Sequence, residues 1–119
     1  MIDRKLLTVI AFWSALWFAV VMAVLPKPPH TPLDQFGDKF EHMLAFGTLA
    51  VLAAIAYRKT PLFRIGERLS FLGAMIELVQ SIPALHRDCD IMDWVADTAI
   101  IVIVLSIAAL IRRPARKAD

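Results

Sequence analysis

Residues 6–25 read LLTVIAFWSALWFAVVMAVL and contain no charged side chain. A membrane-spanning helix needs ~20 largely apolar residues, which matches this stretch. A secretory signal peptide also begins with basic residues such as Arg4 and Lys5, but its apolar region runs only ~7 to 15 residues before a cleavage site. We therefore interpret residues 6–25 as a retained membrane span.

Three further segments have the same apolar character, at 40–57, 69–85 and 91–111. Across the chain 59% of the residues are hydrophobic and 20% are charged, which is too apolar for an ordinary small water-soluble domain. The four segments take 76 of the 119 residues, and no tail or loop between them exceeds 14 residues. Such short connections cannot bury a core of their own. The sequence therefore predicts a single all-α domain, an integral membrane protein built as a compact bundle of four transmembrane helices.

The distribution of Lys and Arg indicates the orientation, because basic residues that flank short spans stay in the cytoplasm. With both termini and the loop between the second and third segments inside, that side carries ten basic and three acidic residues, a net charge of +7. The other side carries three basic and eight acidic residues, a net charge of −5. We therefore expect cytoplasmic N and C termini. We interpret the basic residues as topological anchors and contacts to anionic lipid headgroups, with no nucleic-acid partner.

Prolines and one aspartate mark the expected helix ends. A proline-rich run at 26–32 cannot continue the first helix, and Asp34 or Asp38 is expected to start the second. Pro83 is expected to end or kink the third helix. Trp94 and Tyr57, near opposite ends of their spans, fit the aromatic belts of a membrane protein.

Polar side chains interrupt the apolar segments in the predicted outer half of the membrane. They recur at the spacing of one helical face, as Asp38 and His42, then Glu77 and Gln80, then Asp90, Asp93 and Asp97. A charge that faces lipid at that depth costs about 2.5–3.5 kcal/mol on insertion scales. We therefore expect these side chains to converge inside the bundle.

The order and spacing of these residues resemble the VanZ-like family of small bacterial membrane proteins, over residues 38 to about 99. The matching pieces are DKFEH at 38–42, GAMIELVQ at 73–80, and Arg87 followed by Asp90, Asp93 and Asp97. One departure is Ile100, where the family often has a glycine that allows close helix packing. The resemblance implies a multi-pass protein of the bacterial cytoplasmic membrane that acts in cell-envelope physiology and affects tolerance to teicoplanin-type glycopeptides. It does not imply a defined reaction.

One functional hypothesis is an outward-facing polar pocket that binds or processes a lipid-linked envelope precursor, such as one carried on a polyprenyl phosphate. Glu77 and His42 are the candidate catalytic residues, with Glu77 as a general base or acid. Lys39, His42 and Arg87 are the candidates for holding phosphate, because ammonium and guanidinium groups bind oxyanions. The remaining predicted binding residues are Asp38, Gln80, Asp90, Asp93 and Asp97. Whether the protein is an enzyme stays open at this point.

Several alternatives stay beside this hypothesis. Glu77 could pair with His42 or Lys39, and Asp93 or Asp97 with Arg87, only to hold the four helices in register. Alternatively, Glu77 and Asp97 could relay protons in a small proton-coupled carrier. A hard divalent cation could be bound by Asp88, Asp90 and Asp93, although we assign no metal ligand and no cofactor. The single cysteine, Cys89, cannot form an intrachain disulfide. The bundle could stand alone or form a homo-oligomer through its small residues.

Overall fold

The computed structural model describes residues 3–25, 38–85 and 90–112, without the side chains of residues 38, 39 and 85. In this part of the chain it contains four α-helices and no strand, which confirms the predicted all-α class. The helices are α1 (Arg4–Val24), α2 (Asp38–Ala56), α3 (Leu62–Gln80) and α4 (Ile91–Arg112), and a short 3₁₀ helix, η2, covers Pro83–Leu85. At 1.5 Å per residue the four α-helices are about 29 to 33 Å long, close to the thickness of a bilayer's hydrocarbon core.

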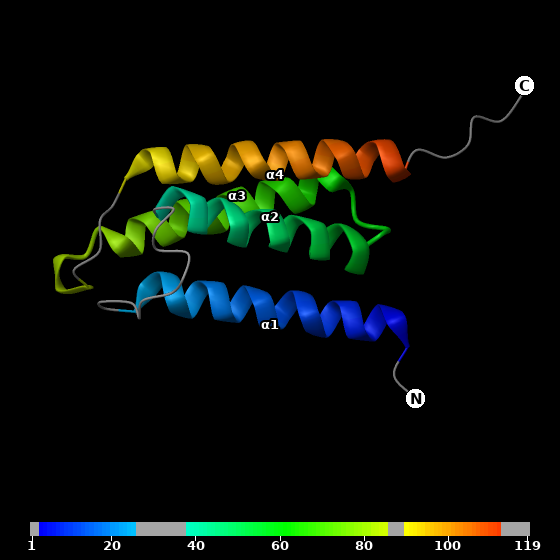
Figure 1. The fold of residues 1–119 in the computed structure, drawn as a ribbon, viewed down its shortest axis with the longest axis horizontal. Coiled ribbons are helices and arrows are strands. Elements are labelled where there is room, and N and C mark those ends of the chain that lie inside the picture. The colour runs from blue at the N-terminus through cyan, green and yellow to red at the C-terminus, as the bar shows by residue number, and fades with distance from the viewer. Residues whose placement is uncertain (1–2, 26–37, 86–89, 113–119) are drawn as a thin grey trace, which may run out of the picture.

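The helices run in alternating directions and lie side by side (Figure 1). Both α2 and α3 pack against α4, while α1 packs mainly against α2. The start of α1 and the end of α4 lie at one end of the bundle, together with the connection from α2 to α3. The start of α2, the end of α3 and the start of α4 therefore meet at the opposite end.

The boundaries of α1, α2 and α4 lie within two residues of the predicted segments, and Asp38 is the first residue of α2, as one of the two expected starts. The third segment differs, because α3 begins at Leu62 rather than residue 69 and ends at Gln80 rather than residue 85. Its first turns carry Arg64 and Arg68, which lower the local hydropathy without disfavouring a helix. The helix ends before Pro83 because proline has no N–H to donate to the carbonyl of Val79. The hydrogen bond from Ser81 N–H to Glu77 O, at 3.1 Å, lies at this end of the helix.

The core lies where α2 faces its three neighbours. Its buried members include Phe12, Phe46, Leu49, Ala50, Ala53, Leu69, Ile101 and Leu105. Alanines on α2 keep that helix thin, which lets neighbouring backbones approach closely. Ile100, the departure from the VanZ-like pattern, packs against a glycine of the facing helix, since a Cβ added at Gly47 would lie 3.4 Å from Ile100 Cγ1. A small residue thus lies on α2 at this crossing.

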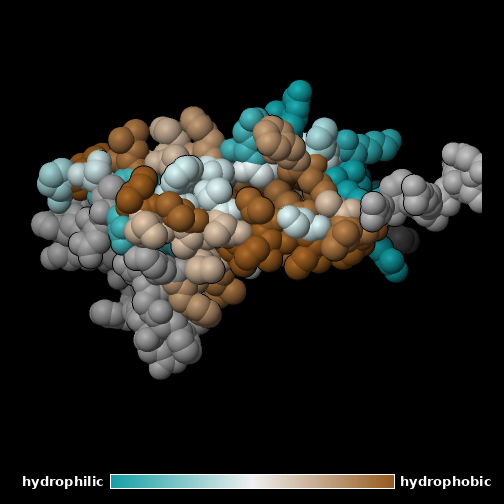
Figure 2. All heavy atoms as spheres, turned by 90° about the horizontal axis from the view of Figure 1, so that it is seen from above, coloured by the Kyte–Doolittle hydropathy of each residue, from teal (hydrophilic) through white to brown (hydrophobic). Residues whose placement is uncertain are grey.

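The outer surface of the bundle is apolar along its middle. Large side chains such as Trp17, Phe18, Phe63 and Ile111 are 65 to 79% exposed. Figure 2 shows hydrophobic atoms gathered over the middle of the molecule and hydrophilic atoms at the end where α1 begins and α4 ends. Contiguous exposed apolar surface of this kind marks contact with a membrane or a partner.

Two helices, α1 and α4, are long and apolar enough to cross a membrane. The apolar part of α2, Phe40–Ala56, is shorter, and α3 carries charges in its first half. Length and composition therefore support a membrane location through two of the four helices.

Arg112 joins α4 to the end of α2. Its guanidinium donates to the carbonyl oxygens of Thr60, Ala54 and Tyr57 at 2.8, 2.7 and 2.9 Å. These carbonyls lie at or just beyond the last turn of α2, where backbone acceptors have no partner within the helix and a positive charge is favourable. Arg112 is thus a helix cap as well as one of the predicted anchors.

Candidate functional site

Four ionisable side chains meet inside the bundle, at the end away from the start of α1. His42 lies just over one turn into α2, Glu77 lies three residues before the end of α3, and Asp93 and Asp97 lie four apart in the first two turns of α4. The alternating helix directions bring these three helix ends together, and the four-residue spacing puts both aspartates on one face of α4. We call His42, Glu77, Asp93 and Asp97 the polar cluster. The convergence predicted from the sequence is present for these residues.

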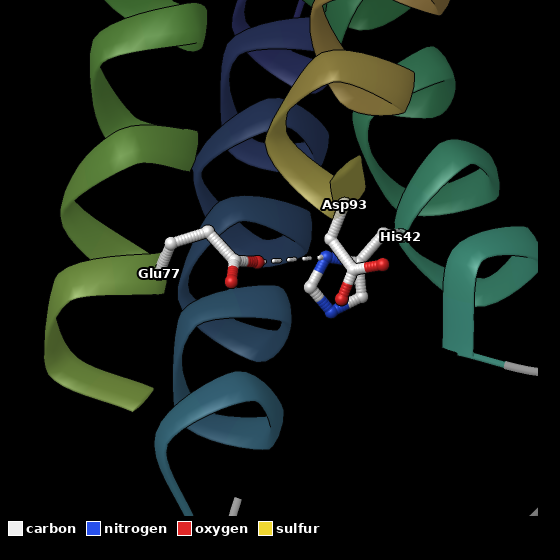
Figure 3. A group of neighbouring side chains, drawn as sticks. All are labelled: His42, Glu77 and Asp93. Atoms are coloured by element: carbon white, nitrogen blue, oxygen red, sulfur yellow. Dashed lines mark ion pairs between the residues drawn. The ribbon is translucent and has the colours of Figure 1, made fainter. Parts of the chain in front are cut away.

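The distances within the polar cluster are short. His42 Nδ1 lies 3.5 Å from Asp97 Oδ2 and 3.9 Å from Glu77 Oε1. One potential ligand atom each from His42, Glu77 and Asp93 lie within 4.8 Å of one another. In Figure 3 these three side chains reach from α2, α3 and α4 toward a common point, and the dashed line joins Glu77 to His42.

The polar cluster is almost completely removed from solvent. Asp97 is 1% exposed, and Glu77 and Asp93 are each 4% exposed. His42 Nδ1, Glu77 Oε1 and both carboxylate oxygens of Asp97 are buried without a hydrogen-bond partner in the described part of the chain. A buried polar atom left unpaired costs about 1–3 kcal/mol, and more when it is charged. Such a concentration of unpaired groups is a feature of binding or catalytic sites rather than of an optimised core.

The second oxygen of Glu77 is held by the start of α4. Glu77 Oε2 accepts a hydrogen bond from Asp90 N–H at 3.0 Å. Asp90 itself caps α4, because its Oδ1 accepts from Met92 N–H at 2.9 Å. Glu77 is therefore fixed by one oxygen and presents the other to His42. Asp90 acts here through its backbone and as a helix cap.

Close contact between α3 and α4 supports Asp97 from behind. A Cβ added at Gly73 would lie 3.4 Å from Trp94 Cδ1 and 3.6 Å from Asp97 Oδ2. One turn earlier on α3, the backbone carbonyl of Ser70 accepts a hydrogen bond from Trp94 Nε1 at 3.0 Å. The side-chain hydroxyl of Ser70 lies 2.9 Å from the hydroxyl of Thr98. The indole of Trp94, predicted only as an interfacial aromatic, thus fixes α4 against α3. No pattern in the sequence marks Ser70 or Thr98, because a hydroxyl in an apolar helix does not indicate which group it will contact.

Gln80 lies outside this arrangement of carboxylates. It is buried, and its Nε2 donates to the carbonyl of Ala23 at 2.8 Å, which ties α3 to the last turn of α1. That carbonyl belongs to the four at a helix end that have no intrahelical donor. The described contact of Gln80 is therefore structural, although it was predicted as a binding residue.

The other predicted binding residues lie at or beyond the edge of the described structure. Asp38 and Lys39 form the first turn of α2, just before His42, and their side chains are not described. Arg87, Asp88 and Cys89 lie outside the described residues.

The described members of the polar cluster are three carboxylates and one imidazole. Even a protonated imidazole supplies one positive charge against three potential negative ones. The group can accept a cation or pass protons among its members, whereas a bare phosphate would be repelled by it. Phosphate binding at this end therefore requires the predicted cations Lys39 and Arg87, or a bound metal ion.

An apolar groove lies on the surface formed by α2 and α4. It has a volume of about 500 Å³, and its lining includes Phe40, Leu44, Val51, Ile100 and Val104. Phe40 is two residues from His42, and Ile100 is three residues from Asp97. The groove therefore follows the two helices that carry His42 and Asp97.

A second cavity lies at the other end of the bundle. It measures about 510 Å³ and is lined by Arg4 and Lys5 from α1 and by Arg58 and Lys59 after α2. These four basic side chains belong to the set predicted to face the cytoplasm. Acidic and basic groups are thus separated along the bundle.

Comparisons with protein-family models, curated proteins and solved structures found no match to this chain. The resemblance to the VanZ-like family therefore rests on the motif residues alone.

Proposed function

We propose that the chain is a VanZ-like, multi-pass protein of the bacterial cytoplasmic membrane, with four spanning helices and both termini in the cytoplasm. The apolar length of α1 and α4, the exposed apolar side chains and the basic residues gathered at one end support this arrangement. In that orientation the polar cluster lies in the outer half of the membrane. Reporter fusions test the topology, since a reporter at either terminus that reads as external would contradict it.

We infer that the polar cluster is the site for a lipid-linked cell-envelope precursor. The observation that carries this inference is a cluster of three buried carboxylates and one largely buried histidine from three helices, several of whose atoms have no hydrogen-bond partner in the described structure. Intramembrane ionisable residues generally mark a site or a pathway rather than a packing feature. The groove on α2 and α4, the two helices that carry His42 and Asp97, supports a lipid as ligand, because its apolar lining suits an isoprenoid chain.

The geometry gives each residue of the proposed site a task. Glu77 and His42 exchange protons with the headgroup, since their facing atoms are 3.9 Å apart and Glu77 is anchored through its other oxygen. Asp97, 3.5 Å from His42 Nδ1, orients the imidazole. Lys39 and Arg87 neutralise the phosphate. The proposed role is in envelope physiology. Because of the resemblance to the VanZ-like family, the phenotype that we expect to depend on this role is tolerance to teicoplanin-type antibiotics.

A proton-coupled carrier is the second candidate. One observation favours it, namely that His42 Nδ1 lies between Glu77 Oε1 and Asp97 Oδ2. A histidine between two carboxylates can pass a proton from one to the other. Proteoliposomes distinguish the two candidates, because a carrier produces solute flux that depends on a pH gradient and a lipid site does not.

The test of the lipid site compares Glu77→Gln and His42→Ala with Glu67→Gln in a strain that lacks the chromosomal copy. Glu67 is an exposed residue of α3 outside the polar cluster, so its replacement is a matched control. We expect the first two variants to be produced and folded at the wild-type level and to lose teicoplanin tolerance, while Glu67→Gln keeps it. Binding of a polyprenyl phosphate in nanodiscs, read by native mass spectrometry, should fall in parallel.

Two outcomes would contradict the proposal. If Glu77→Gln and His42→Ala keep full tolerance and full lipid binding, the polar cluster is not the site. If both variants aggregate in detergent while Glu67→Gln does not, the polar cluster is structural.

A further inference from the structure

The polar cluster has the composition and geometry of a metal centre. We propose that His42, Glu77 and Asp93 bind one divalent transition-metal ion, with Asp97 as a positioning residue behind His42. The three ligands come from α2, α3 and α4, so the ion would join three helices at one point (Figure 3). This inference uses the same residues as the proposed lipid site, and with the ion bound Glu77 and His42 would hold the metal rather than exchange protons with the headgroup.

The separations fit a metal centre. Bonds from Zn²⁺ to imidazole nitrogen or carboxylate oxygen are about 2.0–2.2 Å, so tetrahedral ligand atoms lie about 3.4 Å apart. The potential ligand atoms of His42, Glu77 and Asp93 lie within 4.8 Å of one another. Side-chain rotations that close the group by about 1 Å would therefore complete the coordination, without a shift of the helices.

The unpaired atoms point to a ligand independently of the acidic composition. Asp97 is 1% exposed, and neither of its oxygens has a hydrogen-bond partner in the described structure. Its Oδ2 lies 3.5 Å from His42 Nδ1, close enough for an ion pair with a protonated imidazole. His42 Nδ1 and Glu77 Oε1 also have no hydrogen-bond partner in the described structure. Buried charges in proteins are paired or coordinate metals, and Glu77 Oε1 and Asp97 Oδ2 share the single Nδ1 of His42. A divalent cation between His42, Glu77 and Asp93 would give Glu77 Oε1 a partner of its own.

The donor set selects the class of ion. An imidazole nitrogen favours Zn²⁺, Fe²⁺ and similar transition metals, whereas Ca²⁺ and Mg²⁺ take oxygen ligands alone. Three protein ligands leave at least one coordination position open, as in catalytic rather than structural zinc sites. A carboxylate that accepts from one ring nitrogen of a metal-binding histidine fixes the ring and leaves the other nitrogen for the ion. Asp97 Oδ2 faces Nδ1 of His42, so Nε2 would be the ligand atom.

This site differs from the cation site considered from sequence, which used Asp88, Asp90 and Asp93. Asp90 is occupied as the cap of α4 and as the N–H donor to Glu77. Only Asp93 is common to both sets. The other two ligands, His42 on α2 and Glu77 on α3, are distant from Asp93 in sequence.

The experiment uses the full chain in detergent, with any affinity tag removed and metals stripped by EDTA. Co²⁺ is then titrated while its visible d–d absorption is recorded, and Zn²⁺ is added to displace it. We expect one equivalent of Co²⁺ per chain with the intense absorption of a low-coordinate site. Glu77→Gln and Asp93→Asn should weaken binding by about 100-fold or more, and Glu67→Gln should leave it unchanged. Asp97→Asn should keep the one-to-one stoichiometry, weaken binding by about 10- to 100-fold and alter the Co²⁺ spectrum.

A wild-type protein that shows no Co²⁺ absorption and retains no Zn²⁺ after dialysis overturns the proposal, whether or not the variants fold. Unchanged binding in both Glu77→Gln and Asp93→Asn also overturns it, because the ion would then lie elsewhere. Metal binding without a teicoplanin phenotype would contradict the proposed lipid function and leave the metal centre intact.

Discussion

Replacing Asp97 by asparagine tests whether the polar cluster is functional or structural. A functional cluster predicts that the free energy of unfolding rises, and a structural cluster predicts that it falls. Asp97 is 1% exposed and both of its oxygens lack a hydrogen-bond partner in the described structure, while His42 Nδ1 is 3.5 Å away. An unpaired buried group costs about 1–3 kcal/mol, and more when it is ionised. The asparagine side chain has nearly the same shape and is still polar, but it carries no charge, so the substitution removes the extra cost of a buried charge. We therefore expect Asp97→Asn to raise the free energy of unfolding of the metal-free protein by about 1–3 kcal/mol while weakening function.

The assay is reversible unfolding in mixed micelles with EDTA present, followed by the fluorescence of the three tryptophans. Glu67→Gln is the control, since an exposed change of this kind shifts stability by no more than about 0.5 kcal/mol. If His42 and Asp97 instead form a stabilising buried ion pair, removal of one partner should cost about 3–5 kcal/mol. A loss of that size in Asp97→Asn would refute the functional interpretation.

Two further predictions concern the contacts that hold the helices together. Gln80→Leu removes the donor to the carbonyl of Ala23 but also removes an unpaired Oε1, so the free energy of unfolding should fall by only about 1–2 kcal/mol, measured in the same micelles. A gain in stability would show that the contact to α1 is dispensable. Arg112→Met removes three donors from the end of α2 and should cost about 2–4 kcal/mol, because hydrogen bonds from a charged group are stronger than neutral ones but these are half-buried. Arg64→Met, at an exposed position of α3, is its control, and equal effects in the two variants would contradict the capping role.

The limits of three helices could be predicted to within two residues because their apolar length is the dominant signal. The start of α3 could not, because Arg64 and Arg68 lower the hydropathy of a segment that is still helical. Hydropathy measures the preference of a segment for a membrane. The extent of α3 is instead set by its backbone hydrogen bonds and by Pro61 and Pro83 at its two ends.

The polar cluster was partly predictable, because charges in apolar segments are costly and must have a reason to be there. His42, Glu77, Asp93 and Asp97 were found in this way. The pairing of Glu77 with His42 was one of two that the sequence left open. The contact of Asp97 with His42 was not predictable, because it depends on how α2 and α4 are rotated about their axes. The same limit explains Gln80, which shares a helical face with Glu77 yet reaches the end of α1 instead.

Arg112 shows the converse case. Its position after an apolar span predicts a membrane anchor, but its three acceptors lie at the end of a helix that precedes it by more than fifty residues. No local pattern encodes such a contact.

The most direct test of the central claim is an experimental structure of the protein in nanodiscs that contain a polyprenyl phosphate. We predict density for the headgroup next to the polar cluster, at the end of the bundle where α2 and α4 begin, and for the isoprenoid chain along the groove that Leu44 and Ile100 line. Headgroup density confined to the basic cavity at the opposite end, with nothing at the polar cluster, would contradict the account.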